Sequence, residues 1–276
     1  MTVAFVLGGG GVRGATEVGM LRALLEAGIV PELVVGTSIG AINGAAVAQD
    51  PTLGVVERLE HAWASPTANA VYGESVARQL RRLAQSRTHL NDPDALRGLI
   101  ANMLGADTQF EDLTVPLAVC AASIERASEH WFDTGPVVDA VLASASVPAA
   151  LPPMRIGDEH FIDGGMVNSI PLGEAVKRGA TTIYVLQVGR IEEPLHPPRR
   201  PTDVARVAFE IARRHRFQRE RADVPAEVAL HILPYGGHQP GDERLSAYRR
   251  LDRTHARIEA ARAATAEYLD GLEARG

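Results

Sequence analysis

The 276-residue sequence is poor in cysteine, in aromatic residues and in positive charge, and each shortage excludes a class of protein. Its single cysteine, Cys120, rules out a disulfide within the chain and lies in an apolar run, which predicts a buried thiol. A formal net charge of -6 gives no basic field for a phosphate backbone, so we expect no nucleic-acid partner. With 5% aromatic residues, the core must be filled by Ala, Val and Leu, which suits helices packed closely on a sheet.

Long apolar runs are also missing. No uninterrupted apolar segment approaches the roughly 20 residues that cross a bilayer, so any membrane contact is expected to be peripheral. Met1–Leu7 leads directly into glycines, without the basic and long apolar regions of a secretory signal. We therefore predict a cytoplasmic protein, in contact with a membrane at most at its periphery. No metal-ligand spacing is present, and we predict neither a metal nor a cofactor.

Short apolar runs alternate with helical patterns along the chain, which predicts an α/β fold. The predicted strands are 2–7, 33–35, 113–122, 159–162, 181–188 and 227–233, with a further candidate at 129–132. The predicted helices are one that ends near Gly28, then 41–48, 52–63, 73–85, 92–104, 172–178, 203–222 and 242–272. This alternation predicts a single domain over 1–276, with three α/β/α layers and a mostly parallel central sheet.

The C-terminal part, 202–276, is predicted to be a helical tail. It follows a segment, 194–201, whose four prolines favour a stiff surface connection. Ile258 and Leu269 belong to the expected buried stripe of the last helix.

The helix 203–222 is rich in arginine, which could attract anionic lipid. We favour instead a solvated face whose arginines pair with carboxylates, while the helix packs its apolar residues inward. The arginines are Arg206, Arg213, Arg214, Arg216, Arg219 and Arg221, and the apolar residues are Val204, Val207, Ala208 and Ile211.

The sequence Gly36–Gly40 (Gly-Thr-Ser-Ile-Gly) follows a predicted strand and opens a predicted helix, as a nucleophile elbow does. So sharp a turn strains the central residue, and glycines on either side leave room for it. Ser38 would then stand near the positive end of a helix, where developing negative charge is stabilised. The alternative is a glycine-flanked turn in which Ser38 only caps the helix.

A second glycine-rich block, Gly9–Gly14, ends the first predicted strand. Its spacing fits the dinucleotide fingerprint, but no carboxylate stands at the end of the second strand, since Glu26 and Glu32 precede it. The same glycines suit an oxyanion loop, because amides without side chains can be aimed at a developing negative charge. Arg13 adds a positive charge there, and it could equally tie the loop to a neighbouring carbonyl or carboxylate.

A nucleophilic serine needs a base, and none of the nine histidines has a recognisable setting. His160, in a predicted strand, would point away from Asp163. Asp163 ends that strand and is followed by Gly164 and Gly165, which allow another segment to approach closely. Alone, this Asp-Gly sequence is equally typical of a turn.

Together and in this order, the three blocks Gly9–Gly14, Gly36–Gly40 and Asp163–Gly165 resemble the signature of the patatin-like phospholipases. The stretch Ala143–Pro148, with two prolines soon after it, is also similar to the family, and the resemblance covers about residues 1–190. It implies a patatin-like fold, Ser38 as nucleophile and Asp163 as its base. It also implies an oxyanion hole at Gly10 and Gly11, assisted by Gly9 and Arg13, with Gly14, Gly36, Gly40, Gly164 and Gly165 supporting the motifs.

The resemblance implies a lipid acyl hydrolase, a phospholipase A or carboxylic ester hydrolase, that works through an acyl-enzyme and takes a lipid or phospholipid as substrate. A carboxylate of ordinary pKa is a weak base for a hydroxyl, so we expect burial to raise the pKa of Asp163. Two other possibilities stay open. One is an acyltransferase or thioesterase that uses the same serine, and the other is a non-catalytic module that binds a nucleotide or lipid.

Overall fold

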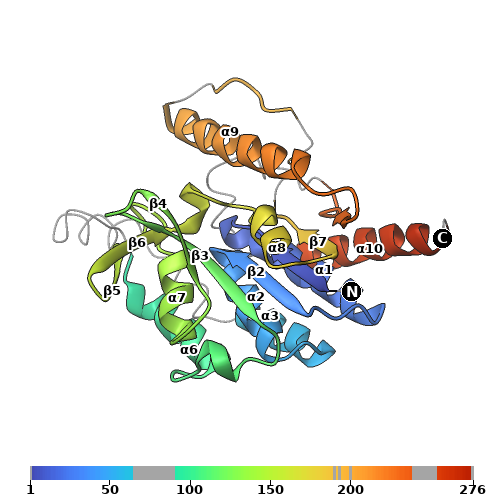
Figure 1. The fold of residues 1–276 in the computed structure, drawn as a ribbon, viewed down its shortest axis with the longest axis horizontal. Helices are drawn as coiled ribbons and strands as arrows, with labels where there is room; N and C mark the ends of the chain where they lie inside the picture. The colour runs from blue at the N-terminus through green and yellow to red at the C-terminus, as the bar shows by residue number, and fades with distance from the viewer. Residues whose placement is uncertain are drawn as a thin grey trace.

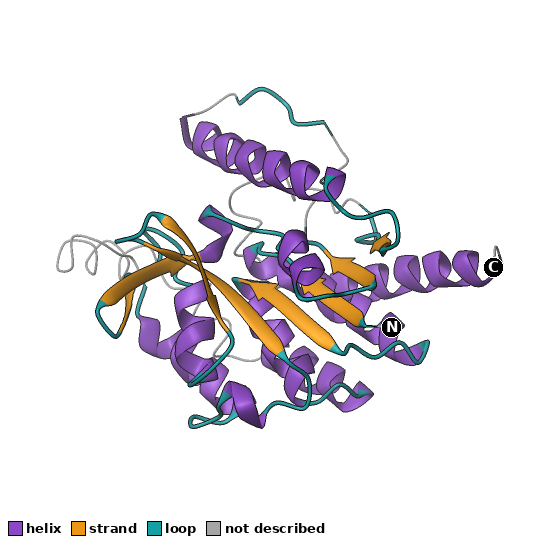
Figure 2. Ribbon diagram, viewed as in Figure 1, coloured by secondary structure: helices purple, strands orange, loops and turns teal. Residues whose placement is uncertain are grey.

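A computed structural model of the chain describes residues 2–64, 91–188, 191, 194–198, 201–237 and 254–274. The helix predicted at 73–85 and the first part of the one predicted at 242–272 lie outside these residues. So do parts of the proline-rich segment, and the side chain of Arg206 is not described either. The fold is a central, mostly parallel sheet with helices on both faces, which confirms the predicted fold class (Figures 1 and 2).

Five parallel strands form the greater part of the sheet, in the order β3-β2-β1-β7-β8. They are β1 (Val3–Leu7), β2 (Leu33–Thr37), β3 (Leu117–Ser123), β7 (Thr182–Leu186) and β8 (Ala229–Ile232). Three antiparallel strands extend it beyond β3, namely β4 (Ser128–Phe132), β5 (Met154–Ile156) and β6 (Glu159–Asp163). All seven predicted strands are present, while β5 was not predicted.

Alternate residues of the strands serve the two faces of the sheet. Phe5 and Leu7 of β1 point into the larger core, whereas Ala4 and Val6 point into the smaller one. The larger core is covered by α1 (Ala15–Glu26), α2 (Ile39–Gln49), α3 (Leu53–Ala64), α6 (Pro93–Leu104), α7 (Val137–Ser144) and α10 (Thr254–Glu273). The smaller core is covered by α8 (Leu172–Lys177) and α9 (Pro201–Ala222). The helices therefore form an outer layer on each side of the sheet.

Local signals set several helix ends. Asp92 caps α6, because its carboxylate accepts a hydrogen bond from the amide of Asp94 at 3.1 Å, and Pro93 begins the helix. Gly28, whose φ is +73°, follows α1 as expected from the sequence. Three short 3₁₀ turns complete the described structure: η1 (Gly11–Gly14), η2 (Phe110–Asp112) and η3 (Gly164–Met166).

One edge of β3 is shared by two strands that arrive from opposite directions. Along this edge β2 runs parallel to β3 and places Thr37 beside Cys120. From the next residue onward the edge is occupied by β6, which runs antiparallel and places Asp163 beside Ala121. Because β4 lies on the other edge of β3, the ends of β2 and β6 meet here. Residues that end these two strands must lie close together in space.

The helix α10 packs across α1, and Gly19 makes this contact possible. A Cβ atom at Gly19 would lie 2.0 Å from the carbonyl oxygen of Ile258, so only a glycine allows the two backbones to approach so closely. Ile258 and Leu269 of α10 are buried, as the sequence predicted.

We therefore expect Gly19→Ala to lower the free energy of unfolding by about 1–3 kcal/mol, because the methyl group must push α10 away from α1. The matched control is Gly98→Ala in α6, where no atom lies within 4 Å of the added Cβ. There the better helix propensity of alanine should stabilise the protein by up to about 1 kcal/mol. Urea denaturation of both variants measures the difference, and equal effects at the two positions would contradict the packing argument.

Candidate active site

Ser38 lies in a strained turn between β2 and α2. Its φ of 56° and ψ of -122° belong to a region that non-glycine residues rarely adopt, at a cost of about 1–3 kcal/mol. The turn is tight because α2 packs against β1: a Cβ atom at Gly40 would lie 2.3 Å from the carbonyl oxygen of Leu7. Gly36 is similarly close to the backbone of Gly40. The predicted strand–turn–helix structure of the elbow is present.

Ser144, the last residue of α7, holds this turn from the side. Its hydroxyl accepts a hydrogen bond from the Ser38 amide at 2.8 Å and donates one to the carbonyl of Cys120 at 2.5 Å. The strained residue is thereby tied to β3. This role was not predicted from the sequence, in which Ser144 stands out only as one of the small residues of Ala143–Pro148. Cys120 itself is fully buried, as predicted, and burial raises the pKa of its thiol.

Asp163 and Ser38 are in direct contact. The Ser38 hydroxyl donates a 2.6 Å hydrogen bond to Oδ2 of Asp163, while Oδ1 accepts one from the amide of Gly165 at 2.7 Å. The Asp163 amide donates to the carbonyl of Ser146 at 2.9 Å. Both side chains are buried, with 6% and 7% of each residue exposed. The carboxylate is therefore fixed with one oxygen toward the serine.

Burial raises the pKa of Asp163 to about 6, although the hydrogen bonds from the Ser38 hydroxyl and the Gly165 amide act in the opposite direction. Water solvates a carboxylate better than the protein interior does, so the charged form is disfavoured here. The direction agrees with the expectation from the sequence. A base with this pKa is ionised at neutral pH and binds a proton more strongly than an exposed aspartate.

The glycine loop, residues 8–14, packs against the side chains of Ser38 and Ile39. A Cβ atom at Gly9 would lie 3.3 Å from Cβ of Ser38, and one at Gly14 would collide with Ile39. The Gly9 amide donates to the carbonyl of Ser169 at 2.8 Å, so this donor is already used. In this arrangement an oxyanion would depend on the amides of Gly10 and Gly11.

A buried polar pair lies beneath the loop. Asn43 donates hydrogen bonds to the carbonyl of Gly14 at 3.0 Å and to Glu17 at 2.7 Å. Burial raises the pKa of Glu17 well above its usual value, despite the hydrogen bond from Asn43. Sequence reasoning did not single out either residue, because Glu17 stands within an otherwise ordinary helix pattern.

Among the described residues, no histidine forms a hydrogen bond with Ser38. His160 interacts instead with Glu125, at 2.7 Å, on the protein surface. His130 and His231 contact Arg126 and Tyr268 respectively. The Ser38 hydroxyl therefore has a carboxylate as its partner, with no imidazole between them.

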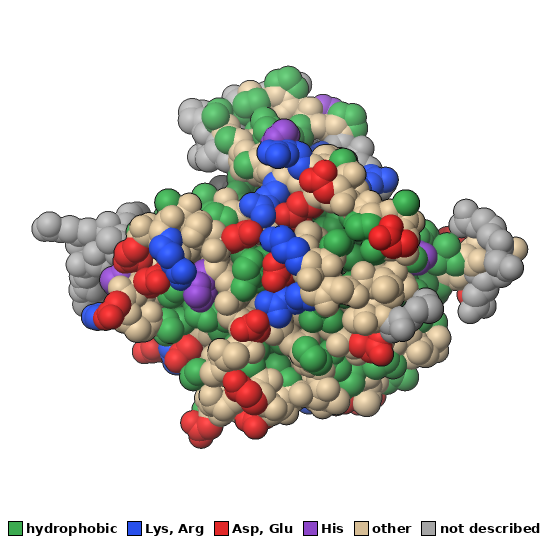
Figure 3. Space-filling view, viewed as in Figure 1, with side chains coloured by type: hydrophobic (Ala, Val, Ile, Leu, Met, Phe, Trp, Pro, Cys, Tyr) green, Lys and Arg blue, Asp and Glu red, His purple; other side chains and the backbone are tan. Residues whose placement is uncertain are grey.

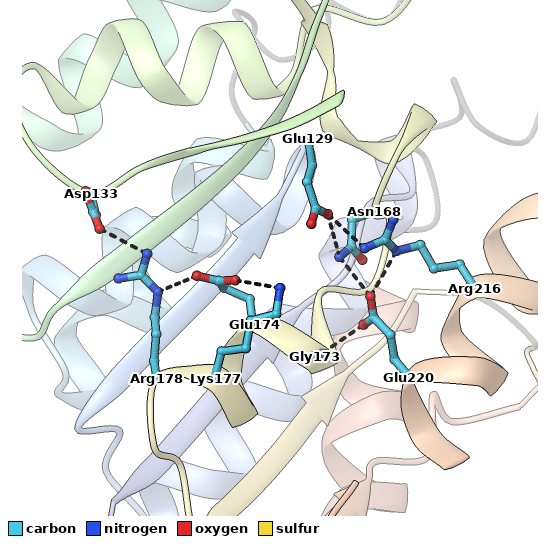
Figure 4. Close-up of polar contacts among 9 residues, drawn as sticks. All are labelled: Glu129, Asp133, Asn168, Gly173, Glu174, Lys177, Arg178, Arg216 and Glu220. Carbon is cyan, nitrogen blue, oxygen red and sulfur yellow. Dashed lines mark hydrogen bonds and ion pairs between the residues drawn. The ribbon is translucent and has the colours of Figure 1, made fainter. Parts of the chain in front are cut away.

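The segment 163–169, here called the Asp163 turn, connects Ser38 to α9. The Thr37 hydroxyl donates to the backbone carbonyl of Asn168 at 2.8 Å, and the Asn168 side chain donates to Glu129 and to Glu220 of α9. Arg216 of α9 bonds the same two carboxylates at 2.8 and 2.9 Å (Figure 4). A second group, in which Arg178 pairs with Glu174 and Asp133, fastens α8 to the end of β4.

The inner face of α9 differs from its prediction. As favoured, Arg213, Arg214 and Arg216 pair with carboxylates, and acidic and basic side chains alternate below the helix (Figure 3). Arg213 is buried, however, so the prediction that this face is solvated was wrong for it. Val207 is buried, but Val204, Ala208 and Ile211 are exposed, so their predicted burial was wrong. The reason is that Glu210, Arg213 and Phe217 recur at helical spacing and occupy the buried face.

Arg13 belongs to the same charged region. Burial opposes ionisation of Glu210, yet its pKa is lowered because three arginines act on it, namely Arg213, Arg214 and Arg13. The positive charge of the glycine loop thus faces a carboxylate of α9. The prediction that Arg13 could tie its loop to a neighbouring carboxylate agrees with this electrostatic contact.

The chain matches known proteins over most of its described core. Residues 5–176 match the family model of the patatin-like phospholipases. Patatin-like phospholipase domain-containing protein 7 of Rattus norvegicus is 32% identical over 193 residues, which cover 69% of this chain and 14% of that protein. For protein 6 of Homo sapiens, the match is 32% over 194 residues, or 70% and 14% of the two chains. Lysophospholipase nte1 of Aspergillus terreus is 29% identical, over 70% of this chain and 12% of that protein.

This chain therefore spans about a seventh of the length of these relatives. Among solved structures, human GIVD cytosolic phospholipase A2 in complex with methyl gamma-linolenyl fluorophosphonate has a similar fold. The TM-score is 0.54 at 12% identity, over 98% of this chain and 57% of that one.

Among the described residues, no helix is long and apolar enough to cross a membrane.

The raised pKa of Asp163 predicts how the reactivity of Ser38 changes with pH. If Asp163 accepts the proton of Ser38, only the ionised carboxylate can do so, and its population falls about tenfold per pH unit below its pKa of about 6. Labelling of Ser38 by a fluorophosphonate probe should therefore accelerate as the pH rises through about 6 and level off above it. Labelling that is quenched at successive times and quantified by mass spectrometry measures this rate. A midpoint near 4, or a rate independent of pH, would contradict the role of Asp163.

Proposed function

Because the chain belongs to the patatin-like phospholipase family, we propose that it is a serine hydrolase that cleaves acyl esters of lipids, with Ser38 as nucleophile and Asp163 as base. The observation that carries this proposal is the 2.6 Å hydrogen bond from the Ser38 hydroxyl to the buried Asp163 carboxylate. It joins a nucleophile on a strained elbow to a base of raised pKa. This pairing is what activation of a weak nucleophile requires.

In the proposed first step, Asp163 accepts the proton of Ser38 while Oγ attacks the acyl carbonyl carbon. Negative charge collects on the carbonyl oxygen, where the amides of Gly10 and Gly11 and the positive end of α2 stabilise it. As the tetrahedral intermediate collapses, the ester C–O bond breaks and Asp163 returns its proton to the departing alcohol oxygen. The acyl group remains on Ser38.

In the second step water takes the place of the alcohol. Asp163 removes a proton from this water while the water oxygen attacks the acyl carbon. The bond between that carbon and Oγ of Ser38 then breaks, and Asp163 returns the proton to Oγ. The fatty acid is released and the dyad returns to its starting state. Asp163 therefore acts as base and acid in turn, for which a pKa of about 6 is better suited than an ordinary aspartate value.

A non-catalytic nucleotide-binding role has less support. The carboxylates that could have held a ribose are engaged elsewhere, because Glu32 accepts a hydrogen bond from the Val3 amide at 2.9 Å and Glu26 pairs with Arg262. Val3 begins β1, whereas the glycine loop follows the end of that strand. Transfer to an acceptor other than water uses the same acyl-enzyme and is distinguished by analysing the products with an added alcohol.

Hydrolysis of p-nitrophenyl esters of increasing chain length tests the proposal. We expect activity to rise with chain length, to vanish in Ser38→Ala, and to fall on the order of 10⁴-fold in Asp163→Asn, as when other catalytic serine sites lose a member. The folded state binds the proton of Asp163 more tightly than the unfolded state does, because the pKa is raised on folding. The free energy of unfolding therefore falls as pH rises from about 4 to about 6, and this loss is complete above about 6. Asp163→Asn should therefore unfold at an equal or higher temperature at pH 8, which separates lost activity from lost structure. Near-normal hydrolysis by either variant would refute the dyad.

We further propose that the outer face of α9 contacts the lipid surface. Val204 and Ile211 lie on one face of the helix and are exposed at 53% and 56%, and hydrophobic side chains lie at the surface around this helix (Figure 3). Phe209, on another face, is 38% exposed and reaches the active site, because its ring tip lies 3.5 Å from the position of a Cβ atom at Gly165. Apolar side chains beside a site for apolar substrates suit contact with a membrane interface.

Ile211→Ser combined with Val204→Ser should then weaken binding to phosphatidylcholine vesicles, while hydrolysis of a short, soluble p-nitrophenyl ester stays the same. Vesicle co-sedimentation measures the binding. Val30→Ser is the matched control. Val30 is similarly exposed, but it precedes β2, whereas Ser38 follows the other end of that strand. Unchanged sedimentation of the double variant would refute the contact. A change in its size-exclusion volume would instead assign the face to self-association.

A further inference from the structure

Arg213 is a buried arginine with unused hydrogen-bond donors. Its side chain is 3% exposed, and Nη2 donates to Oε2 of Glu210 at 2.8 Å. Its Nε and Nη1 atoms are buried and have no hydrogen-bond partner in the part of the chain that the structure describes. Arginine remains charged in proteins, and unsatisfied donors on a buried charge are costly. Such donors indicate a missing acceptor.

The position of Arg213 on α9 places it near the active site. Four residues before it, Phe209 lies against Gly165 in the Asp163 turn. Three residues after it, Arg216 bonds Glu129, which also holds the Asn168 side chain. Residues three and four apart share one face of a helix, so Arg213 belongs to the face that covers the Asp163 turn.

Ser169 supplies a second unused donor in this region. Its hydroxyl is buried and has no hydrogen-bond partner among the described residues. The oxygen lies 3.3 Å from the position of a Cβ atom at Gly9 and 3.8 Å from the one at Gly165. This last residue of the Asp163 turn therefore places its hydroxyl beside Gly9 of the glycine loop and near Gly165.

The charges of this region favour an anion. Three arginines, Arg213, Arg214 and Arg13, act on the carboxylate of Glu210, so the surroundings of Arg213 are rich in positive charge. An anionic group that entered here would satisfy the unused donors of Arg213 by charge-assisted hydrogen bonds. The phosphate of a glycerophospholipid has suitable chemistry, because it lies only a few covalent bonds from the acyl ester.

We propose that Arg213 binds the phosphate of the lipid substrate and so makes the enzyme select phosphate-bearing acyl esters over neutral ones. The proposal rests on the proposed function. One helical turn, about 5.4 Å, separates Arg213 from Phe209, which covers the Asp163 turn. This position beside the cover of the Asp163 turn suits a substrate whose ester is at Ser38 and whose phosphate is at Arg213. Since both donors are covered, the phosphate reaches them when α9 moves outward.

The test compares Arg213→Gln with wild type on two substrates that share their acyl chains: dihexanoylphosphatidylcholine and dihexanoylglycerol. We expect kcat/KM on the phospholipid to fall about 10- to 100-fold, as for the loss of hydrogen bonds to a charged group. On the neutral glyceride it should change by less than about threefold. Arg213→Lys keeps the charge and should recover part of the preference for the phospholipid.

Two further variants guard against a purely structural effect. Arg178→Gln removes another ion-paired arginine from the same face of the sheet, one whose partners are Glu174 and Asp133, and should leave the preference unchanged. If Arg213→Gln does not fold because Glu210 is left unpaired, the double variant Glu210→Gln with Arg213→Gln removes both charges and is expected to lose the same preference.

An equal loss on both substrates, with Arg213→Gln folded, would overturn the proposal and make Arg213 a structural residue. A free-anion site would overturn it too: inorganic phosphate would then inhibit wild-type hydrolysis of both substrates, with no preference for the phospholipid. Hydrolysis that persists in Ser38→Ala would refute the proposed function itself. These results differ from one another, so failure of the phosphate site is distinguishable from failure of the dyad.

Discussion

The whole site depends on the edge of β3 that β2 and β6 share. Because the two strands arrive from opposite directions and end at neighbouring residues of β3, Ser38 and Asp163 meet without any long side chain to bridge them. The junction is so close that a Cβ atom at Gly164 would lie 2.2 Å from the carbonyl oxygen of Cys120. Backbone register, more than side-chain reach, thus sets the 2.6 Å hydrogen bond. A shift of β6 by one residue would turn Asp163 to the other face of the sheet.

Much of the fold was predictable because buried strands are apolar runs, yet the sequence did not predict how the strands pair. Strand β5 was missed because it has only three residues, Met154–Ile156, too few to establish the alternation of a strand, and none of them is fully buried. The outward face of α9 was predicted wrongly for a related reason. Prediction assigns apolar residues to the inner face of a helix, whereas here Glu210 and Arg213 are buried. Their burial depends on ion pairs, which a hydropathy pattern does not contain.

The motif residues of the site were predicted from the sequence, while the residues that support them were not. Ser38, Asp163 and the glycines stand in short blocks whose order is informative. Three residues support the site by hydrogen bonds to distant parts of the backbone. The Ser144 hydroxyl accepts from the Ser38 amide, the Ser146 carbonyl accepts from the Asp163 amide, and the Asn43 side chain donates to the carbonyl of Gly14. Serine and asparagine are common in loops and at helix ends, so nothing local distinguishes these three. Their roles follow from tertiary structure alone.

The features that make the dyad reactive are also those that strain the fold. Positive φ at Ser38 and a buried carboxylate at Asp163 each oppose folding. Hydrogen bonds from the Gly165 amide and to Ser144 partly offset these costs, yet the pKa of Asp163 stays near 6. More hydrogen bonds to the carboxylate would stabilise its charge but weaken it as a base. The site therefore keeps one oxygen of Asp163 for the Gly165 amide and leaves the other to the Ser38 hydroxyl, as the proposed activation of Ser38 without histidine requires.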